Sequence, residues 1–99
     1  MINPLTCGQA RELLARGAQL VDVRSPAEHA AGALPGAANL PVEAISQRAH
    51  LLDPAKPVLL YCRSGARSGA ARNFLHSLGF LEAYNLGAYH AWRGCTESA

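Results

Sequence analysis

The sequence predicts an α/β domain, a three-layer fold in which helices cover both faces of a small, mostly parallel sheet of about four to five strands. Short apolar runs, of the length typical of buried strands, alternate along the chain with segments of helical periodicity. Glycine and proline residues separate the two kinds of segment and mark the turns. The chain of 99 residues, 49% of them hydrophobic, is sufficient for one domain over residues 1–99 with a buried core.

The first helix and the first strand are predicted by the signals at their ends. Thr6 and Gln9 have the spacing of a capping box, which predicts a helix over residues 8–16 that ends at Gly17. The apolar run 19–23 follows, and turn-forming residues bound it on both sides, as expected of a buried strand.

A second capping box opens the next helix. Ser25 and Glu28 have the same spacing, and a proline occupies the first position of a short helix expected over 26–31. A short strand over 37–40 and a helix over 43–50 are expected to follow.

The second half of the chain continues the alternation. Two prolines exclude regular structure from the loop 53–57, and the run 58–61 is the most apolar strand candidate. A helix that ends at Gly79 is expected next. Its apolar face comprises, at helical spacing, Ala70, Ala71, Phe74, Leu75 and Leu78. The last expected elements are a strand over 82–85 and a helical turn over 87–93, in which Trp92 packs into the core.

The composition argues against several classes of protein. A net charge of +2 is too small to indicate nucleic-acid binding, and no apolar run is long enough to span a membrane. Residues 1–4 do not begin a signal peptide, because no basic segment precedes an apolar one. We therefore expect a cytoplasmic protein that binds neither nucleic acid nor membranes.

The three cysteines, Cys7, Cys62 and Cys95, are widely spaced. They form no CxxC pair, which argues against a zinc site or a thioredoxin-like dithiol, and a disulfide is not expected in the cytoplasm. Cys7 and Cys95 are interpreted as structural residues, with a role as a second thiol that resolves a persulfide as the alternative. No metal is expected, because ligand spacing is absent among the histidines His29, His50, His76 and His90.

The segment around Cys62 carries the strongest chemical signal. Cys62 stands between the strand 58–61 and the next helix, and Gly65 permits a tight turn there. Such a loop can direct successive backbone N–H groups inward as an anion-binding nest, and the helix N-terminus and the side chains of Arg63 and Arg67 add positive charge. A thiol in this setting is expected to ionise readily and to act as a nucleophile.

Two simpler interpretations stand beside this one. Cysteine is often a small core residue, so Cys62 could be buried at a strand end ahead of a solvated turn. The chain also has no acidic residue from 54 to 81, and the basic residues there could cluster on a solvated face by chance rather than create a positive field around Cys62. These basic residues are Lys56, Arg63, Arg67 and Arg72.

Three motifs, in order and at the right separations, resemble those of the single-domain rhodaneses, a family of sulfurtransferases. Residues 20–24, LVDVR, followed by Glu28 and His29, resemble the family's "DVR…E" segment. Residues 32–41 resemble its "GHIPGAxNIP" segment, and residues 62–68 resemble its "CRSGxRS" active-site loop. The resemblance covers nearly the whole chain and implies the rhodanese-like form of the three-layer fold.

The resemblance implies sulfur transfer from a small anionic donor such as thiosulfate, through a persulfide of Cys62, to cyanide, a thiol or a protein acceptor. It implies no metal or organic cofactor. The substrate cradle would be formed by Arg63, Ser64, Gly65, Ala66 and Arg67. A polar cluster near the same sheet edge, either supporting the loop or touching the substrate, would be formed by Asp22, Arg24 and Glu28.

The chain departs from the family pattern at Ala33, where histidine is common, and at Ala88, where many members have glycine. Neither position belongs to the loop. A phosphatase or arsenate reductase of similar fold is a second hypothesis, but its loop needs an arginine six positions after the cysteine, where this chain has Ser68. A third hypothesis is a sulfur carrier or a regulatory interaction module that does not turn over thiosulfate.

Overall fold

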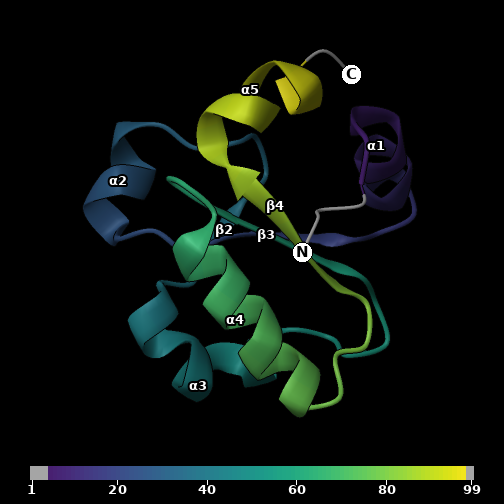
Figure 1. Cartoon of the computed structure of the whole chain (residues 1–99), viewed down its shortest axis with the longest axis vertical. Coiled ribbons are helices and arrows are strands. Elements are labelled where there is room, and N and C mark those ends of the chain that lie inside the picture. The colour runs from purple at the N-terminus through teal and green to yellow at the C-terminus, as the bar shows by residue number, and fades with distance from the viewer. Residues whose placement is uncertain (1–4, 98–99) are drawn as a thin grey trace.

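The computed structural model describes residues 5–97, in which helices and strands alternate (Figure 1). The α-helices are α1 (Cys7–Ala15), α2 (Pro26–Ala31), α3 (Ile45–Arg48), α4 (Ala66–Ser77) and α5 (Tyr89–Glu97). The strands are β1 (Gln19–Asp22), β2 (Ala38–Asn39), β3 (Val58–Cys62) and β4 (Ala83–Ala88). Short 3-10 helices flank α3, namely η1 (Val42–Ala44) and η2 (Ala49–Leu51).

Within residues 5–97, four strands form one parallel sheet in the order β2-β1-β3-β4. This confirms the predicted α/β class and the small parallel sheet. Strand β3 is central and every residue in it is buried. Asp22, at the end of β1, pairs with Tyr61 of β3, so the carboxyl ends of these two strands meet at one edge of the sheet. Ligands of parallel sheets bind beyond that edge.

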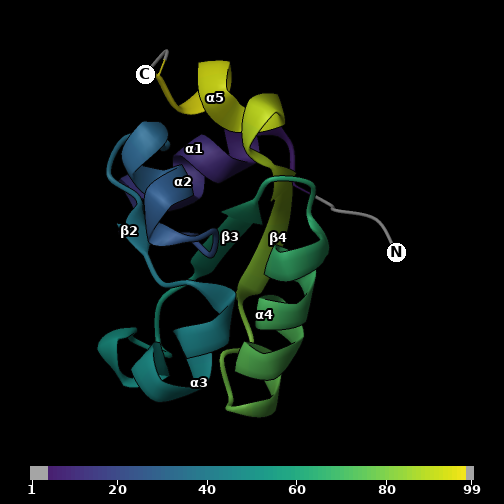
Figure 2. The same ribbon diagram turned by 90° about the vertical axis from the view of Figure 1, so that its left-hand side faces the viewer.

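Helices cover both faces of the sheet, and each face has its own apolar cluster (Figures 1 and 2). On one face, Val21, Leu60 and Leu75 of α4 belong to a single cluster with residues of α3. On the other face, Leu20, Leu59 and the helices α1 and α5 form the second cluster. Alternate residues of β1 and β3 therefore pack in opposite directions, as the pleat of a buried strand requires.

Both predicted capping boxes are present. The Thr6 hydroxyl accepts from the N–H of Gln9 at 3.1 Å, and the Gln9 side chain accepts from the N–H of Thr6 at 2.8 Å. The Ser25 hydroxyl accepts from the N–H of Glu28 at 3.2 Å, with the reciprocal bond at 2.9 Å. These bonds satisfy N–H groups that would otherwise lack partners at the helix starts.

Several boundaries differ from the prediction. The helix expected over 43–50 is broken into η1, α3 and η2, in which Ile45 and Ala49 are buried. Strand β4 runs on through Gly87 and Ala88, so the last helix begins at Tyr89 and extends to Glu97. On α4, the predicted apolar face is wrong for Ala70 and Leu78, which are exposed.

Trp92 is buried, as predicted, and its indole N–H donates to the carbonyl of Leu86. The expectation of no disulfide is wrong, because Cys7 of α1 is bonded to Cys95 of α5. The two helices pack against each other on the same face of the sheet, which brings the two sulfurs together (Figure 1). The expectation that residues 1–4 do not begin a signal peptide concerns a segment outside the described residues.

Candidate active site

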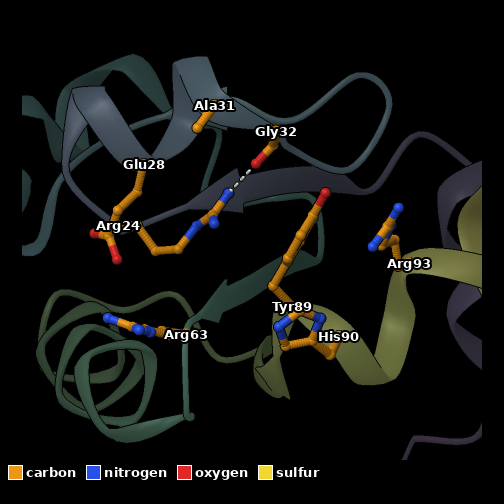
Figure 3. Close-up of a pocket in the computed structure, with 8 residues that line it drawn as sticks. All are labelled: Arg24, Glu28, Ala31, Gly32, Arg63, Tyr89, His90 and Arg93. Carbon is orange, nitrogen blue, oxygen red and sulfur yellow. Dashed lines mark hydrogen bonds between the residues drawn. The ribbon is translucent and has the colours of Figure 1, made fainter.

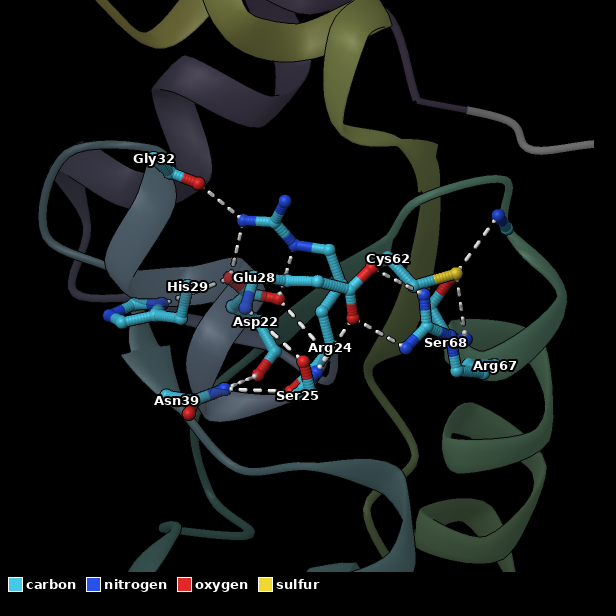
Figure 4. Close-up of polar contacts among 11 residues, drawn as sticks. Asp22, Arg24, Ser25, Glu28, His29, Gly32, Asn39, Cys62, Arg67 and Ser68 are labelled. Carbon is cyan, nitrogen blue, oxygen red and sulfur yellow. Dashed lines mark hydrogen bonds and ion pairs between the residues drawn. The ribbon is translucent and has the colours of Figure 1, made fainter.

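Cys62 is the last residue of β3 and is fully buried. Its Sγ accepts hydrogen bonds from the N–H of Gly65 at 3.0 Å and from the N–H of Ser68 at 3.4 Å, with the Ser68 hydroxyl also at 3.4 Å (Figure 4). Loop 63–65 and the first turn of α4 thus form a cradle whose donors converge on one sulfur atom. Of the three cysteines, all within residues 5–97, Cys62 alone is free.

Gly65 determines how closely the loop can fold over the sulfur. Its φ of +102° lies in the left-handed region, which glycine adopts far more readily than other residues. A Cβ at this position would lie 3.3 Å from the Cα of Gly87 on β4. A side chain at Gly65 would therefore strain the backbone and push the loop away from the strand.

Ser68 and Asn85 hold the cradle in place, and the sequence did not assign either of them to the site. The Ser68 hydroxyl has a single proton, and two acceptors compete for it, Asn85 Oδ1 at 2.6 Å and Cys62 Sγ at 3.4 Å. Asn85 Nδ2 donates to the carbonyl of Gly65 at 3.1 Å. Asn85 Oδ1 also accepts from the N–H of Gly87 at 2.9 Å. The one signal for Ser68 was its place as the last residue of the CRSGxRS-like motif.

The cradle favours the thiolate form of Cys62. Burial raises the pKa of the Cys62 thiol, but the hydrogen bonds of the cradle lower it by more, so the pKa lies below its ordinary value. The first of these bonds comes from the Ser68 hydroxyl, and the others come from the backbone N–H groups of Ser68, Gly65 and Ser64. Donors that point at an ionised sulfur stabilise it relative to the neutral thiol.

Replacing Ser68 by alanine is expected to raise the pKa of the Cys62 thiol, because the hydrogen bond from the Ser68 hydroxyl is one of the contacts that lower it. The measurement is a pH titration of ultraviolet thiolate absorbance, with Cys62→Ser protein as the baseline. Ser77→Ala is the matched control, since the Ser77 hydroxyl donates to the Phe74 carbonyl near the other end of α4. An unchanged titration midpoint in Ser68→Ala would contradict the assigned role.

The two arginines of the loop differ in their surroundings. Arg67 makes a bidentate ion pair with Glu28 of α2, with N–O distances of 2.8 and 3.1 Å. The bond from Arg67 lowers the pKa of Glu28 to about 2, and the N–H of Ser25 adds to the effect. Glu28 therefore completes a helix cap and ties α2 to α4. Arg63 is exposed and faces the pocket beside the loop (Figure 3).

Asp22 and Arg24 form a buried ion pair at the end of β1. Asp22 is 0% exposed and Arg24 is 6% exposed. The Arg24 guanidinium donates to both carboxylate oxygens of Asp22, at 2.9 and 2.8 Å, and the Arg24 N–H adds a third bond at 2.9 Å. His29 Nδ1 lies 2.9 Å from the same carboxylate. Burial raises the pKa of Asp22, but these bonds lower it by more, so its pKa lies below its ordinary value.

Arg24 also organises the surface next to the loop. Its guanidinium donates to the carbonyl of Gly32 at 2.6 Å and lies 4.5 Å from the ring centroid of Tyr89 and 5.5 Å from that of Tyr61. The Tyr61 hydroxyl in turn accepts from the N–H of Leu34 at 3.0 Å. The Asp22–Arg24 pair thus connects β1, the segment after α2 and the first residue of α5.

A pocket of about 460 Å³ lies beside the cradle, between α2, the loop and α5 (Figure 3). Its lining residues are Arg24, Glu28, Ala31, Gly32, Arg63, Tyr89, His90 and Arg93. Of the residues that the sequence assigned to the site, the structure places Cys62 at the end of β3, Ser64 and Gly65 in the loop that follows, and Ala66 at the start of α4. It separates Arg63, which lines the pocket, from Arg67, which is paired.

No group of three or more histidine, cysteine, aspartate or glutamate side chains within residues 5–97 could hold a metal ion. No helix of the described part of the chain is long and apolar enough to cross a membrane.

Comparison with known proteins places the chain in a family. Residues 6–95 match the model of the rhodanese-like domain. An uncharacterised protein of Bacillus subtilis, YqhL, is 44% identical over 80 residues, which cover 80% of this chain and 64% of YqhL. Human thiosulfate:glutathione sulfurtransferase is 40% identical over 101 residues, covering 85% of this chain and 87% of that protein. The chain belongs to the rhodanese-like family, which confirms the resemblance seen in its motifs.

Comparison with solved structures supports the same family. Human single-domain sulfurtransferase TSTD1 matches with a TM-score of 0.73 at 35% identity, over 93% of this chain and 96% of that one. Relatives that are named as sulfurtransferases support rhodanese-type sulfur transfer at the level of the family. The chain spans somewhat less than two thirds of the length of YqhL.

Proposed function

We propose that this protein is a sulfurtransferase that moves sulfane sulfur from a donor such as thiosulfate to cyanide or a thiol through a persulfide of Cys62. The observation that carries the proposal is the cradle, in which the donors of Gly65 and Ser68 converge on a single ionisable sulfur. The name of the human relative, a thiosulfate:glutathione sulfurtransferase, supports the same kinds of donor and acceptor.

In the first step, the Cys62 thiolate attacks the outer sulfur of thiosulfate. The sulfur–sulfur bond of the donor breaks, and its electron pair leaves with sulfite, so that Cys62 becomes a persulfide. The lowered pKa of Cys62 favours the thiolate that this step requires. Arg63, which is exposed beside the loop, is the cation we assign to the dianionic donor, with Arg67 adding charge while it holds Glu28.

In the second step, the acceptor attacks the terminal sulfur of the persulfide. The bond between the two sulfurs breaks, and Cys62 leaves as a thiolate that the cradle stabilises again. Backbone N–H groups fixed in place are effective here because they need no rearrangement as the charge moves. In the persulfide, the Cys62 side chain turns so that these donors meet the terminal sulfur instead of Sγ, in the manner of an oxyanion hole.

Access to the sulfur requires a local movement. Because Cys62 is 0% exposed, a donor reaches its Sγ only when the side chain turns outward or when loop 63–65 moves away from the sulfur. Arg63 and Ser64 of this loop are exposed and pack little, which makes the loop the segment that can move at low cost.

The phosphatase hypothesis fits this geometry less well. Ser68 stands where those enzymes need an arginine, and it is buried with its N–H directed at Sγ and its hydroxyl oxygen 3.4 Å from Sγ. The cradle therefore encloses one sulfur rather than a tetrahedral oxyanion. A carrier or regulatory module remains the second candidate, and turnover distinguishes it from an enzyme because a carrier loads sulfur only once.

The test is the production of thiocyanate from thiosulfate and cyanide over many turnovers. Wild-type protein is expected to be active, and Cys62→Ser is expected to lose roughly a thousandfold or more in rate, because the nucleophile is gone. The double variant Cys7→Ser/Cys95→Ser, which keeps Cys62, is the matched control and is expected to retain turnover. A single loading without turnover would support the carrier, and hydrolysis of a phosphate ester would support the phosphatase.

We also propose that the chain is a single domain over residues 1–99, that it is cytoplasmic, and that a protein accepts the sulfur in the cell. The Cys7–Cys95 disulfide is of a kind typical of oxidising compartments, whereas cytoplasmic thiols are usually kept reduced. Rapid alkylation of thiols in intact cells, followed by mass analysis, tests the location, because a reduced pair is expected in the cytoplasm.

A further inference from the structure

Strand β4 carries a β-bulge beside the cradle. Two successive residues of β3 pair with Asn85 and Gly87, so Leu86 between them is an extra residue. Bulges change the direction of nearby side chains and are common next to active sites. The Asn85 side chain spans this bulge and accepts from the N–H of Gly87 at 2.9 Å. Gly69 of α4 leaves room for it, since a Cβ there would lie 3.2 Å from Asn85 Nδ2.

Two backbone groups fix the orientation of the Asn85 amide. The carbonyl of Gly65 only accepts, so the atom 3.1 Å from it is the amide nitrogen. The N–H of Gly87 only donates, so the atom that faces it is Oδ1. Oδ1 is therefore the atom that lies 2.6 Å from the Ser68 hydroxyl. Because an amide oxygen is an acceptor only, the hydroxyl directs its proton at Asn85 in this arrangement.

The sulfur of Cys62 is the second acceptor for that proton. The Ser68 oxygen lies 3.4 Å from Sγ, so rotation of the hydroxyl brings its proton to the sulfur without movement of the oxygen. A neutral thiol is a weak acceptor, whereas an ionised group forms hydrogen bonds about twice as strong as those of a neutral one. The proton is therefore expected to stay with Asn85 while Cys62 is neutral and to turn toward Sγ when Cys62 ionises.

The burial of Ser68 makes this choice of acceptor important for the reaction. Ser68 is 0% exposed, and a buried hydroxyl that loses its acceptor costs free energy. When the Cys62 thiolate attacks thiosulfate, a bond forms between Sγ and the outer sulfur, and the electron pair of the broken sulfur–sulfur bond leaves with sulfite. Negative charge thereby leaves Sγ, and the hydroxyl needs another acceptor at that moment.

We propose that Asn85 is a positioning residue for sulfur transfer, whose Oδ1 accepts the hydrogen bond of the Ser68 hydroxyl as charge leaves Sγ, while its Nδ2 holds Gly65 in the cradle. The step that Asn85 assists rests on the proposed sulfur transfer, but the competition for the hydroxyl proton does not. The proton stays on Ser68 throughout, and only the direction of its hydrogen bond changes.

The first test measures how strongly the Ser68 hydroxyl stabilises the thiolate when residue 85 is asparagine, alanine or aspartate. Asn85→Ala and Asn85→Asp both lose the donor to Gly65, but alanine removes the competing acceptor and aspartate strengthens it. Adding Ser68→Ala is therefore expected to raise the midpoint of the thiolate titration most in Asn85→Ala, less beside Asn85 and least in Asn85→Asp. Loosening of the cradle alone would move both variants in the same direction.

Asn73 provides the matched control. It is exposed on α4, and its Oδ1 accepts from Arg72 rather than from a group of the cradle. Asn73→Ala and Asn73→Asp are expected to leave the effect of Ser68→Ala as it is. The titration needs no sulfur donor, so the ordered series supports the role of Asn85 even if thiosulfate turnover fails. An equal effect of Ser68→Ala with all three residues at position 85 overturns it, and if one variant does not fold, the other still decides.

The second test follows formation of the Cys62 persulfide from thiosulfate at a pH above every midpoint, where all the proteins start as thiolates. Asn85→Ala is expected to react about fivefold more slowly than wild-type protein, because the buried hydroxyl is left without an acceptor. Adding Ser68→Ala removes that hydroxyl and is expected to restore most of the rate. A double variant that reacts no faster than Asn85→Ala overturns the proposal.

Discussion

Asp22→Asn is expected to lower the free energy of unfolding by about 3 kcal/mol or more, because it leaves the buried Arg24 charge without its partner. Asp22 accepts three hydrogen bonds from Arg24 and lies against His29, and its side chain is completely buried. A small domain has a total stability of about 5–15 kcal/mol, so a loss of this size is easily detected. Urea unfolding at neutral pH measures it.

The matched control for Asp22→Asn is Glu12→Gln on α1. Glu12 also pairs with an arginine, Arg16, but at 3.8 Å with both side chains more than 60% exposed. That change is expected to cost no more than about 0.5 kcal/mol. Equal losses in the two variants would contradict the importance that we give to the buried pair.

The same pair makes stability depend on pH. Because the pKa of Asp22 is lowered in the folded state, its contribution to stability is fully present above its unfolded pKa and is lost as the pH falls through the folded value. Glu28, with its pKa lowered to about 2, acts in the same direction. Wild-type stability is therefore expected to fall in acid, and the fall is expected to be smaller in Asp22→Asn, since one of the two carboxylates is absent.

Reduction of the Cys7–Cys95 disulfide is expected to lower the free energy of unfolding by about 2–4 kcal/mol. The bond joins residues that are 88 positions apart, so it closes nearly the whole chain into a loop and restricts the unfolded ensemble strongly. It also fixes α5, which carries Tyr89 and Arg93 of the pocket. Urea unfolding with and without a thiol reductant measures the effect.

Two controls isolate the disulfide. Cys7→Ser/Cys95→Ser is expected to match the reduced wild-type protein and to be insensitive to the reductant. Cys62→Ser keeps the disulfide and is expected to lose stability on reduction just as the wild-type protein does. A wild-type unfolding curve that reductant does not move would show that the bond adds nothing to stability, contrary to this prediction.

Local signals in the sequence were enough to predict much of the fold. The capping boxes at Thr6 and Ser25 predicted the starts of α1 and α2, and the apolar run before Cys62 predicted β3. These signals are readable because each one depends only on residues that are close in the sequence. The broken helix around α3 could not be predicted in the same way. Its form depends on which positions the sheet buries, and that is a property of the assembled fold.

The same difference between local and long-range contacts explains which residues of the site could be predicted from the sequence. The CRSGxRS-like motif drew attention to Cys62 and Gly65, which lie within hydrogen-bond distance because the loop is continuous in sequence. Asn85 was missed because it comes from β4, and no local pattern marks it. The pairing of Cys7 with Cys95 was missed because it depends on α1 and α5 packing together, and the expected compartment argued against a disulfide.

The most direct test of sulfur transfer through Cys62 is the intact mass of the protein after incubation with thiosulfate and no acceptor. Wild-type protein is expected to gain one sulfur atom and to lose it when cyanide is added, with thiocyanate appearing, whereas Cys62→Ser is expected to gain none. A sulfur atom gained equally by Cys62→Ser, or none gained by wild-type protein from thiosulfate, would contradict the proposed reaction.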